Sequence, residues 1–408
     1  MRARPKPSRI VVLGTVASNP YGGMAWMHMQ IVAGLKRLGH DVYYFETTSA
    51  WPYDPVRNAR VCDSEYSLPY LERTAREFGL GDRWAYRRSY LDKEWFGMSR
   101  TRAEALLANA DAVLNVTGAT RLAEEGLKVG RLVYFGTDPV YHEVCYANGD
   151  EETRSILAEH DDVVTYGENI GNPGCPLPPL PGLVGRTRQP VLIDQWSAGP
   201  PSRGVFTTVA NWRQEGREVE FQGQSYQWSK HHEFLKFLDA PRRVRTPIEL
   251  ATNLVDPETI RHGEGEAVRA LGFDADDRKL LESHGWGFTE SRWFSTSPWP
   301  YRDYIRASRG ELSVARDLNV RLRSGWFSER SACYLAAGRP VVTQNTGFDC
   351  VLPTGEGLFA FHTLDDIVSA FESIEADYDR HSRAARQIAD EFFRAERVLA
   401  KLMADLSL

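Results

Sequence analysis

The chain has 408 residues, of which 42% are hydrophobic and 25% charged, and its formal net charge is -6. A chain of this length has more residues than a domain with a single hydrophobic core usually has, so we predict two domains. The acidic balance argues against a protein that grips a nucleic-acid backbone, because such proteins carry a basic excess. No apolar run approaches the roughly 20 residues that a membrane-spanning helix needs.

Five cysteines are scattered along the chain without a C-x-x-C pair. This pattern favours neither a disulfide framework nor a zinc site, and we expect a cytoplasmic protein. The basic start and the short apolar run after it imitate a signal peptide, but the run leads directly into a Gly-containing turn. We therefore expect a basic tail followed by a first strand at 10–16.

Strands and helices alternate over residues 9–170. The apolar run 10–16, the helical spacing of 27–38 and the strand-like run 41–45 form a strand–helix–strand unit, which implies parallel strands. Further apolar runs, at 112–116, 132–135 and 163–166, each end in small or polar residues. The pattern predicts a doubly wound α/β domain over residues 1–170, with ligands at the carboxyl ends of its strands.

A Pro-rich stretch follows this domain. Residues 171–201 contain eight prolines, which disfavour a continuous helix or a central strand, and we predict a linker there. A second alternating series covers residues 202–381, and a final helical stretch covers 382–408. In the second series we expect strands at 205–210 and 248–252 and helices near 230–238 and 301–308.

The most informative segment is 324–357. A loop leads through Ser328 into a short helix, and an apolar strand then ends at the turn Thr346-Gly347. Such a loop and helix start direct free backbone N–H groups and the positive end of a helix dipole at one point, as a phosphate site does. Arg330 and Ser331, near the helix start, are further phosphate candidates.

This segment resembles the donor-sugar region of group 1 GT-B glycosyltransferases, in which a loop, a helix, an Ala-x-Gly-x-Pro-Val-Val turn and a Gly-containing loop surround a nucleotide-sugar. The resemblance implies two Rossmann-like, doubly wound α/β domains that face each other across a cleft. It implies an NDP-sugar held mainly by the second domain and an acceptor held mainly by the first. The final helix is then expected to pack back on the first domain.

The activity that the resemblance implies is transfer of a sugar from an NDP-sugar to a hydroxyl or amine of a small molecule, such as a natural product. No cofactor or metal is required if cations and helix N-termini carry the diphosphate charge. The acidic loop 274–277 superficially matches a metal-binding Asp-x-Asp motif, but its position away from a strand end favours a solvated turn.

The acidic residues of the segment depart from the family pattern. The family places two glutamates about two helical turns apart, and the matching positions hold Gly325 and Cys333. Glu329 lies one turn before Cys333 and is a candidate for a displaced carboxylate, or it serves only the helix dipole. Asp349 falls where relatives carry an acid near the sugar hydroxyls.

The resemblance also implies an Arg and a Lys that hold the donor diphosphate. Arg213, after a strand, and Lys230, at a helix start, occupy the two places, although either alone is compatible with a surface charge. Trp286, after an expected strand, is a candidate aromatic face for the nucleotide base or a core residue.

Three features of the first domain are candidates for the site, the first for ligand binding and the other two for catalysis. The pair Gly22-Gly23 lets the backbone approach a ligand closely, or it forms only a turn. His28, on the helix that follows, is a candidate base, with a structural histidine as the alternative. Asp138 ends an apolar strand and is the preferred catalytic carboxylate, which would orient His28 or take the proton of the acceptor itself. The alternative is that Asp138 caps local backbone N–H groups before Pro139.

Two other functions stay open at this point. One is a non-catalytic GT-B-like protein that binds a sugar nucleotide or a partner enzyme, which Gly325 and Cys333 support. The other is a sugar-nucleotide epimerase. The sequence leaves open the sugar, the base, the acceptor, the stereochemistry and the oligomeric state.

Overall fold

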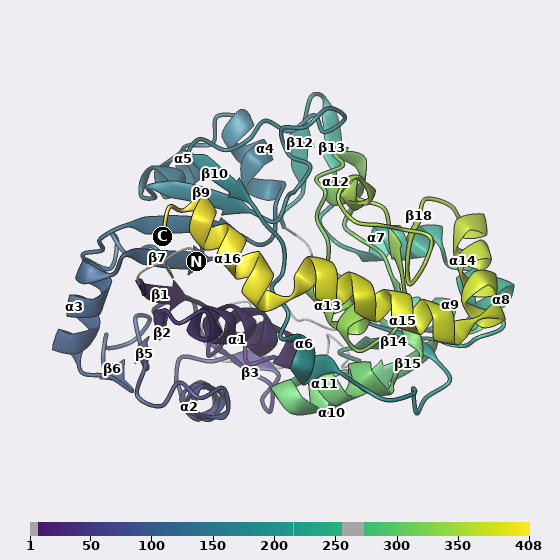
Figure 1. Ribbon diagram of the computed structural model, residues 1–408, viewed down its shortest axis with the longest axis horizontal. Helices are drawn as coiled ribbons and strands as arrows, with labels where there is room; N and C mark the ends of the chain where they lie inside the picture. Colours follow the sequence, from purple (N-terminus) through teal and green to yellow (C-terminus); the bar gives the residue numbers. More distant parts are fainter. Residues whose placement is uncertain (1–6, 215, 255–272) are drawn as a thin grey trace, which may run out of the picture.

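Two parallel sheets organise the chain in the computed structural model, which describes residues 7–214, 216–254 and 273–408 (Figure 1). Each sheet carries helices on its faces, which confirms the expected pair of doubly wound α/β domains. Residues 1–6 of the predicted basic tail lie outside the described residues.

The first sheet has eight strands among the described residues, in the order β10-β9-β8-β7-β1-β2-β5-β6, and only β6 is antiparallel to its neighbour. The order reverses between β1 and β7, which makes that point the place where an open α/β sheet binds ligands. The strands are β1 (Arg9–Leu13), β2 (Asp41–Glu46), β5 (Trp84–Arg87), β6 (Trp95–Phe96), β7 (Ala112–Val116), β8 (Leu132–Gly136), β9 (Asp162–Thr165) and β10 (Leu183–Arg186).

Helices and one short hairpin complete this domain. They are α1 (Gly22–Arg37), the hairpin β3 (Tyr53–Asp54) and β4 (Ala59–Arg60), α2 (Ser67–Glu77), α3 (Arg100–Asn109), α4 (Tyr141–Ala147) and α5 (Glu151–Ala158). The long helix α1 starts just after Pro20 and ends with Lys36 and Arg37, two cations that suit the negative end of its dipole. Gly39 follows at a φ of 95°, which stops the helix.

The second sheet is parallel throughout, in the order β15-β14-β11-β16-β17-β18. Its order reverses between β11 and β16. The strands are β11 (Phe206–Val209), β14 (Ile248–Thr252), β15 (Gly287–Glu290), β16 (Gly310–Ser313), β17 (Val341–Gln344) and β18 (Leu358–Phe361), with a separate hairpin of β12 (Val219–Phe221) and β13 (Gln224–Tyr226). The helices are α7 (His231–Lys236), α8 (Ala240–Arg243), α9 (Ala275–Ser283), α10 (Arg292–Ser295), α11 (Pro298–Ala307), α12 (Asp317–Arg321), α13 (Glu329–Ala336), the short η2 (Phe348–Cys350) and α14 (Leu364–Ala376).

Part of the Pro-rich segment 171–201 belongs to the first sheet rather than to a linker. Strand β10 lies within the segment and pairs with β9 at the sheet edge, where prolines nearby cost no ladder hydrogen bond. The chain then crosses to the second domain through α6 (Ile193–Trp196) and reaches β11. The crossing is therefore shorter than the predicted linker 171–201.

The final helical stretch is broken, unlike the continuous helix expected over 382–408. It consists of α15 (Tyr378–Ile388), the π-helical η3 (Ala389–Phe393) and α16 (Ala395–Asp405). Arg394, at φ -52° and ψ 121°, is not helical, and this residue separates η3 from α16. Helix α16 packs back on α1 of the first domain, where a Cβ on Gly34 would lie 2.4 Å from Leu399 (Figure 1).

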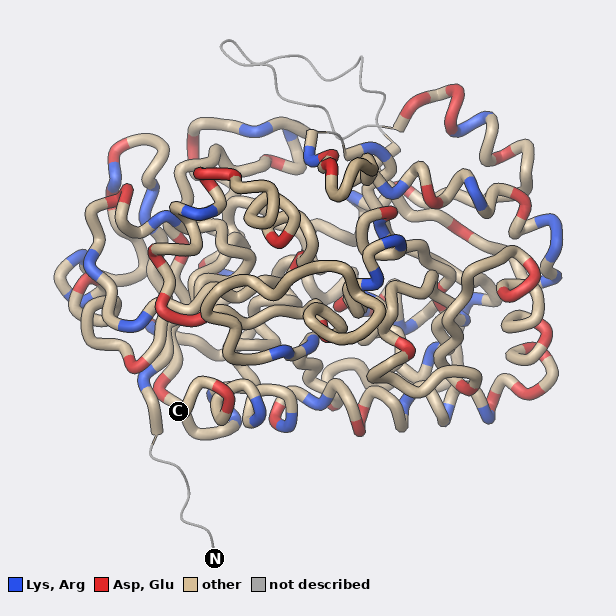
Figure 2. Tube along the Cα trace, turned by 90° about the horizontal axis from the view of Figure 1, so that it is seen from above, with Lys and Arg blue, Asp and Glu red and all other residues tan. Residues whose placement is uncertain are grey.

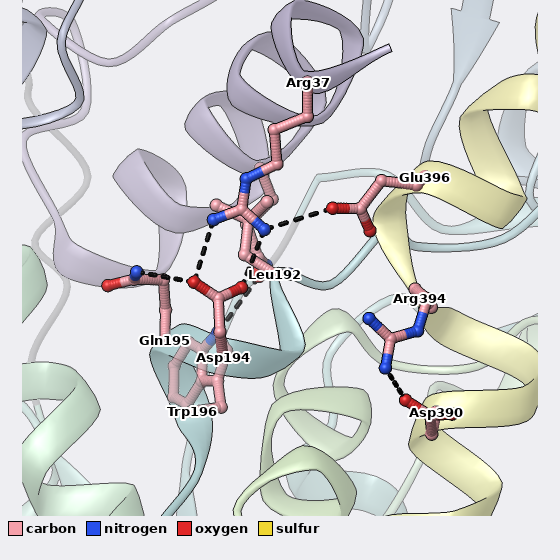
Figure 3. Close-up of polar contacts among 9 residues, drawn as sticks. Arg37, Leu192, Asp194, Gln195, Trp196, Asp390, Arg394 and Glu396 are labelled. Carbon is pink, nitrogen blue, oxygen red and sulfur yellow. Dashed lines mark hydrogen bonds and ion pairs between the residues drawn. The ribbon is translucent and has the colours of Figure 1, made fainter.

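The two segments that cross between the domains are joined to each other and to α1. The amide of Val191 donates to Phe393 over 2.7 Å, and Val191 accepts from the amide of Ala395 over 2.9 Å. Figure 3 shows Arg37 reaching from α1 to both carboxylate oxygens of Asp194, at 2.7 and 2.9 Å, and to Glu396 at 3.1 Å. One guanidinium of the first domain thus holds both crossing segments.

Apolar packing also runs through both domains. The indole N–H of Trp26, in α1, donates to the carbonyl of Pro298 in α11 over 2.7 Å. On the opposite side of the interface the hairpin β12–β13 packs against α4, where Phe221 and Val144 belong to one buried cluster. The domains therefore meet through packed apolar surface as well as polar contacts.

Charge is distributed evenly over the molecule. Figure 2 shows Lys and Arg interleaved with Asp and Glu along the described trace, rather than gathered in a basic stripe. The five cysteines, which all lie in the described residues, are free. In the part of the chain that the structure describes, no helix is both long and apolar enough to cross a bilayer.

Candidate functional site

Lys230 lies beside the point where the strand order of the second sheet reverses. The residue follows the hairpin β12–β13 and precedes α7, and it is partly buried. Its Nζ atom lies 5.5 Å from the ring centroid of Trp326 and makes no hydrogen bond or ion pair with any described residue. Burial, together with the nearby guanidinium groups of Arg330 and Arg316, lowers the pKa of Lys230 well below its ordinary value.

Arg330 spans the ends of the two strands at the reversal. Its Nε donates to Glu311 over 2.6 Å and its Nη2 to the hydroxyl of Ser313 over 2.7 Å, both in β16. Its Nη1 donates to the carbonyl of Val209, the last residue of β11. These contacts hold the guanidinium in place. Because they use its Nε, Nη1 and Nη2 atoms, Arg330 offers a ligand its positive charge rather than unused N–H donors.

Arg316 connects the second domain to Asp138 of the first. Its Nη1 donates to Oδ1 of Asp138 over 2.5 Å, and its guanidinium carbon lies 3.8 Å from the ring centroid of Trp228. Asp138 follows the end of β8, as predicted, and Arg316 follows the end of β16. The ion pair thus joins the carboxyl ends of the two sheets, and Asp138 makes none of the local capping bonds that were its alternative role among the described residues.

The backbone beside Asp138 is strained. Val140 has φ 95° and ψ -49°, a conformation that a β-branched residue adopts only under constraint. Its amide donates to Oε2 of Glu143 over 2.7 Å, and burial raises the pKa of Glu143 to about 7. Such strain is concentrated at functional sites, where the surrounding structure holds it.

His28 is fully buried in α1. Its Nδ1 lies 2.8 Å from the carbonyl of Met24, an acceptor, so this nitrogen carries the proton. Its Nε2 is buried and has no hydrogen-bond partner among the residues that the structure describes. Burial lowers the pKa of His28 to about 4, which keeps the ring neutral at pH 7. No described contact joins His28 to Asp138.

The glycine pair lies where the first domain meets α11. A Cβ on Gly22 would lie 2.5 Å from the carbonyl oxygen of Ser297 and from Cβ of Tyr301, and one on Gly23 would lie 3.3 Å from the Tyr301 hydroxyl oxygen. Close packing of the two domains therefore requires a glycine at position 22. This packing is a reason for the pair that the sequence alone does not reveal.

Glu329 contacts the first domain. Its Oε1 accepts from Nε2 of Gln30 over 2.8 Å and from the thiol of Cys333 over 3.2 Å. Burial raises the pKa of Glu329 to about 7. Beside it, the hydroxyl of Ser331 is buried and finds no partner in the described part of the chain, and Ser328 precedes α13 without a side-chain capping bond there.

Two of the predicted ligand residues are occupied by protein contacts. Arg213 forms a two-point ion pair with Asp277, with Nε–Oδ2 at 2.8 Å and Nη2–Oδ1 at 3.0 Å. Trp286 is only 4% exposed and donates to the carbonyl of Leu238 over 2.9 Å, so it lies in the core of the second domain. The strand expected before Trp286 was wrong, since helix α9 precedes it and β15 follows it.

The turn after β17 closes the same edge of the second sheet. The Thr346 hydroxyl donates to the carbonyl of Trp326 over 2.5 Å, and Gly347 adopts a φ of 91°, which suits glycine. Asp349 is exposed and lies 3.8 Å from Nη2 of Arg323. Thr346 thus touches the aromatic residue that lies beside Lys230.

Two functional features escaped the sequence reasoning. Arg316 ends the run Glu-Leu-Ser-Val-Ala-Arg, so the strand-end argument that selected Asp138 would have selected it as well. Glu46, at the end of β2, accepts from the amides of Ala17 and Ser18 at 2.7 and 2.6 Å and thereby fixes the loop before α1. Glu46 could have been found from the sequence, because it is an acidic residue at the end of the apolar run of β2, where ligand sites of α/β sheets lie.

Comparison with family models and with curated proteins finds no match for this chain. Solved structures match it over nearly its whole length. HepE from Anabaena, in complex with UDP and glucose, is 10% identical, with 98% of this chain and 99% of that chain covered and a TM-score of 0.56. Sucrose-phosphate synthase from Thermosynechococcus elongatus is 12% identical, with 98% and 99% covered and a TM-score of 0.51. An alpha-glucosyltransferase in complex with UDP and a 13-mer DNA is 11% identical, with 98% and 100% covered and a TM-score of 0.56.

These matches agree with the topology of the molecule. Each sheet reverses its strand order once, and the C-terminal helix returns to the first domain. The chain has the GT-B glycosyltransferase fold.

Proposed function

We propose that this protein is a nucleotide-sugar-dependent glycosyltransferase that moves a sugar to a hydroxyl or amine of a small molecule. One observation carries the proposal: the amino group of Lys230, a partly buried residue, lies at the reversal between β11 and β16 and has no hydrogen-bonding partner within the described residues. Its surroundings lower the pKa of Lys230 and so disfavour the charged form, and a bound nucleoside diphosphate would supply the anion that favours it.

The residues around Lys230 suit a departing diphosphate. The Lys230 ammonium would bind its oxygens directly, while Arg330, fixed between Glu311 and Ser313, would add positive field without moving. The start of α13 after Ser328 presents free backbone N–H groups to the same ligand. HepE has been solved with UDP-glucose, which makes uridine the first base to test.

The reaction requires a base on the acceptor side. The acceptor oxygen or nitrogen attacks the anomeric carbon, the bond from that carbon to the diphosphate breaks, and the diphosphate leaves with the electron pair. Asp138, which joins the ends of the two sheets, is the proposed acceptor of the proton. His28 remains a second candidate through its unpartnered Nε2.

An activity assay tests the proposal. The purified protein is incubated with UDP-, GDP-, ADP- and dTDP-sugars, with and without a panel of hydroxyl and amine acceptors, and products are followed by anomer-resolved NMR. At least one donor should be hydrolysed or transferred. If no donor is hydrolysed or transferred while the protein is intact and folded, the proposal that this protein is an enzyme is contradicted.

A non-catalytic sugar-nucleotide-binding protein is a second candidate, which one observation favours. Cys333 is fully buried, and a Cβ on Gly325 would lie 2.5 Å from the amide nitrogen of Asn169. Neither place where relatives carry a glutamate therefore accommodates a carboxylate facing a ligand. The two candidates differ in outcome: both should bind a nucleoside diphosphate, but only the enzyme should consume the donor.

A further inference from the structure

The ion pair between Asp138 and Arg316 links the two domains at the proposed donor site. Its partners are 178 residues apart in the chain and meet at the carboxyl ends of β8 and β16. The Asp138 side chain is 36% exposed and that of Arg316 is 13% exposed. The carboxylate is therefore accessible to an acceptor while it is bound to the guanidinium.

Arg316 and Asp138 both act on Lys230. The guanidinium of Arg316 lowers the pKa of Lys230, and the carboxylate of Asp138 raises it, so all three groups share one electrostatic environment. The third cation there, Arg330, is bound to Glu311, whose side chain is fully buried. Arg316 is thus the guanidinium of this cluster whose carboxylate partner is partly exposed.

Both partners are held by their surroundings. The guanidinium of Arg316 lies over Trp228, which is buried, and its Nε atom is buried with no hydrogen-bond partner among the described residues. The backbone after Asp138 is fixed by the bond between Val140 and Glu143. A change of partner at Arg316 therefore needs only a small side-chain movement and no separation of the packed domains.

We propose that a bound nucleoside diphosphate takes over the Nη1 donor of Arg316 and thereby releases the carboxylate of Asp138 for acceptor deprotonation. This inference rests on the proposed function. In the ion pair, Oδ1 of Asp138 accepts from the guanidinium and is not free for the proton of an acceptor. Once the guanidinium binds phosphate, Oδ1 of Asp138 loses its ion-pair partner and is free to accept a hydrogen bond from the acceptor. Acceptor activation thus depends on an occupied donor site.

Binding measurements on variants test this exchange. Isothermal titration with UDP, GDP and ADP identifies the diphosphate that the wild-type protein binds most tightly, and the same ligand is then titrated into Asp138→Asn. We expect that variant to bind about 3- to 10-fold more tightly, since the ligand no longer competes with a carboxylate for Arg316. The control is Asp82→Asn, which removes an exposed carboxylate paired with Arg102, and its affinity should equal that of the wild type.

A double-mutant cycle separates the exchange from a general charge effect. In the Arg316→Gln background, adding Asp138→Asn should leave the affinity for the diphosphate unchanged, because the guanidinium N–H that Asp138→Asn would free is already absent. If the gain persists there, Asp138 acts on Lys230 alone and the exchange is wrong. Unchanged or weaker binding by Asp138→Asn would also overturn it.

A crystal structure of the wild-type complex decides the matter without any variant. With the diphosphate bound, Arg316 should contact a phosphate oxygen and lie beyond hydrogen-bond distance from Asp138. An intact Asp138–Arg316 pair beside a bound diphosphate would overturn the inference. Absence of binding by all three diphosphates would instead contradict the proposed function itself.

Discussion

Gln30 in α1 donates a hydrogen bond from Nε2 to Oε1 of Glu329 in α13, over 2.8 Å. The other end of the same amide, Oε1, accepts from the amide of Leu192 at 2.9 Å and from the indole of Trp196 at 3.0 Å. One buried side chain thus joins the first domain, the crossing segment and the second domain. The interface depends on this amide because each of its partners is otherwise withdrawn from water.

Replacing Gln30 with Ala should therefore destabilise the whole protein. The change leaves the donors of Leu192 and Trp196 without a partner, and we expect the free energy of unfolding to fall by about 3 kcal/mol. Urea unfolding followed by tryptophan fluorescence measures it. Gln195→Ala is the matched control, since within residues 7–214, 216–254 and 273–408 that side chain bonds only to the neighbouring Asp194, and it should change stability little. Equal losses in the two variants would contradict the role of Gln30.

Glu329 should make stability depend on pH. Its pKa rises from 4.5 to about 7 on folding, because burial disfavours the carboxylate, so folding takes up a proton between these values. The stabilisation is complete below pH 4.5 and is lost as pH rises through 7. The variant Glu329→Gln cannot ionise, and its stability relative to the wild type should increase by about 1 to 2 kcal/mol between pH 5.5 and pH 8.

Thermal and urea unfolding at the two pH values measures this difference. Glu356→Gln is the control, because Glu356 lies on the surface and its pKa is lowered by the ion pair with Arg380. Its stabilisation is lost only as pH falls toward acid, so its offset from the wild type should be the same at pH 5.5 and pH 8. A constant offset for Glu329→Gln as well would show that Glu329 is ionised throughout.

Gly22 should tolerate no side chain. An added Cβ would lie 2.5 Å from the backbone carbonyl oxygen of Ser297, which immediately precedes α11, and 2.5 Å from Cβ of Tyr301. We expect Gly22→Ala to cost about 2 kcal/mol of stability. Gly204→Ala provides the comparison, because its Cβ would meet nothing within 4 Å. Circular dichroism melting curves of both variants check the prediction, and a neutral Gly22→Ala would contradict the packing described for α1 and α11.

Much of the fold could be predicted from periodicity. Buried parallel strands leave continuous apolar runs, and for this reason 112–116 and 248–252 agree residue for residue with β7 and β14. Strand β10 was missed because it contains Gly185 and lies between Pro181 and Pro190, which disguise a short edge strand. The break at Arg394 was missed because it follows from pairing with Val191, about 200 residues away, and local helix propensity does not register such contacts.

The site was predictable only to the level of single strand ends. Asp138 and Lys230 stand out because they follow or begin elements at the expected edge of a sheet. Their partners do not stand out in the sequence, because the ion pair of Asp138 with Arg316 depends on how the two domains pack together. For Trp286 the sequence shows an aromatic ring but not its environment; the apolar residues before it belong to a helix, and the ring lies in the core.

The central claim, a diphosphate held by Lys230, is tested most directly by titrating UDP, GDP and ADP into the wild type and Lys230→Met. We expect at least one diphosphate to bind the wild type, and the variant to bind it about 30-fold or more weakly, because a charge-assisted hydrogen bond contributes about 2 kcal/mol. Lys279→Met, an exposed cation in α9, is the control and should bind as the wild type does. Equal affinity of Lys230→Met and the wild type would contradict the account.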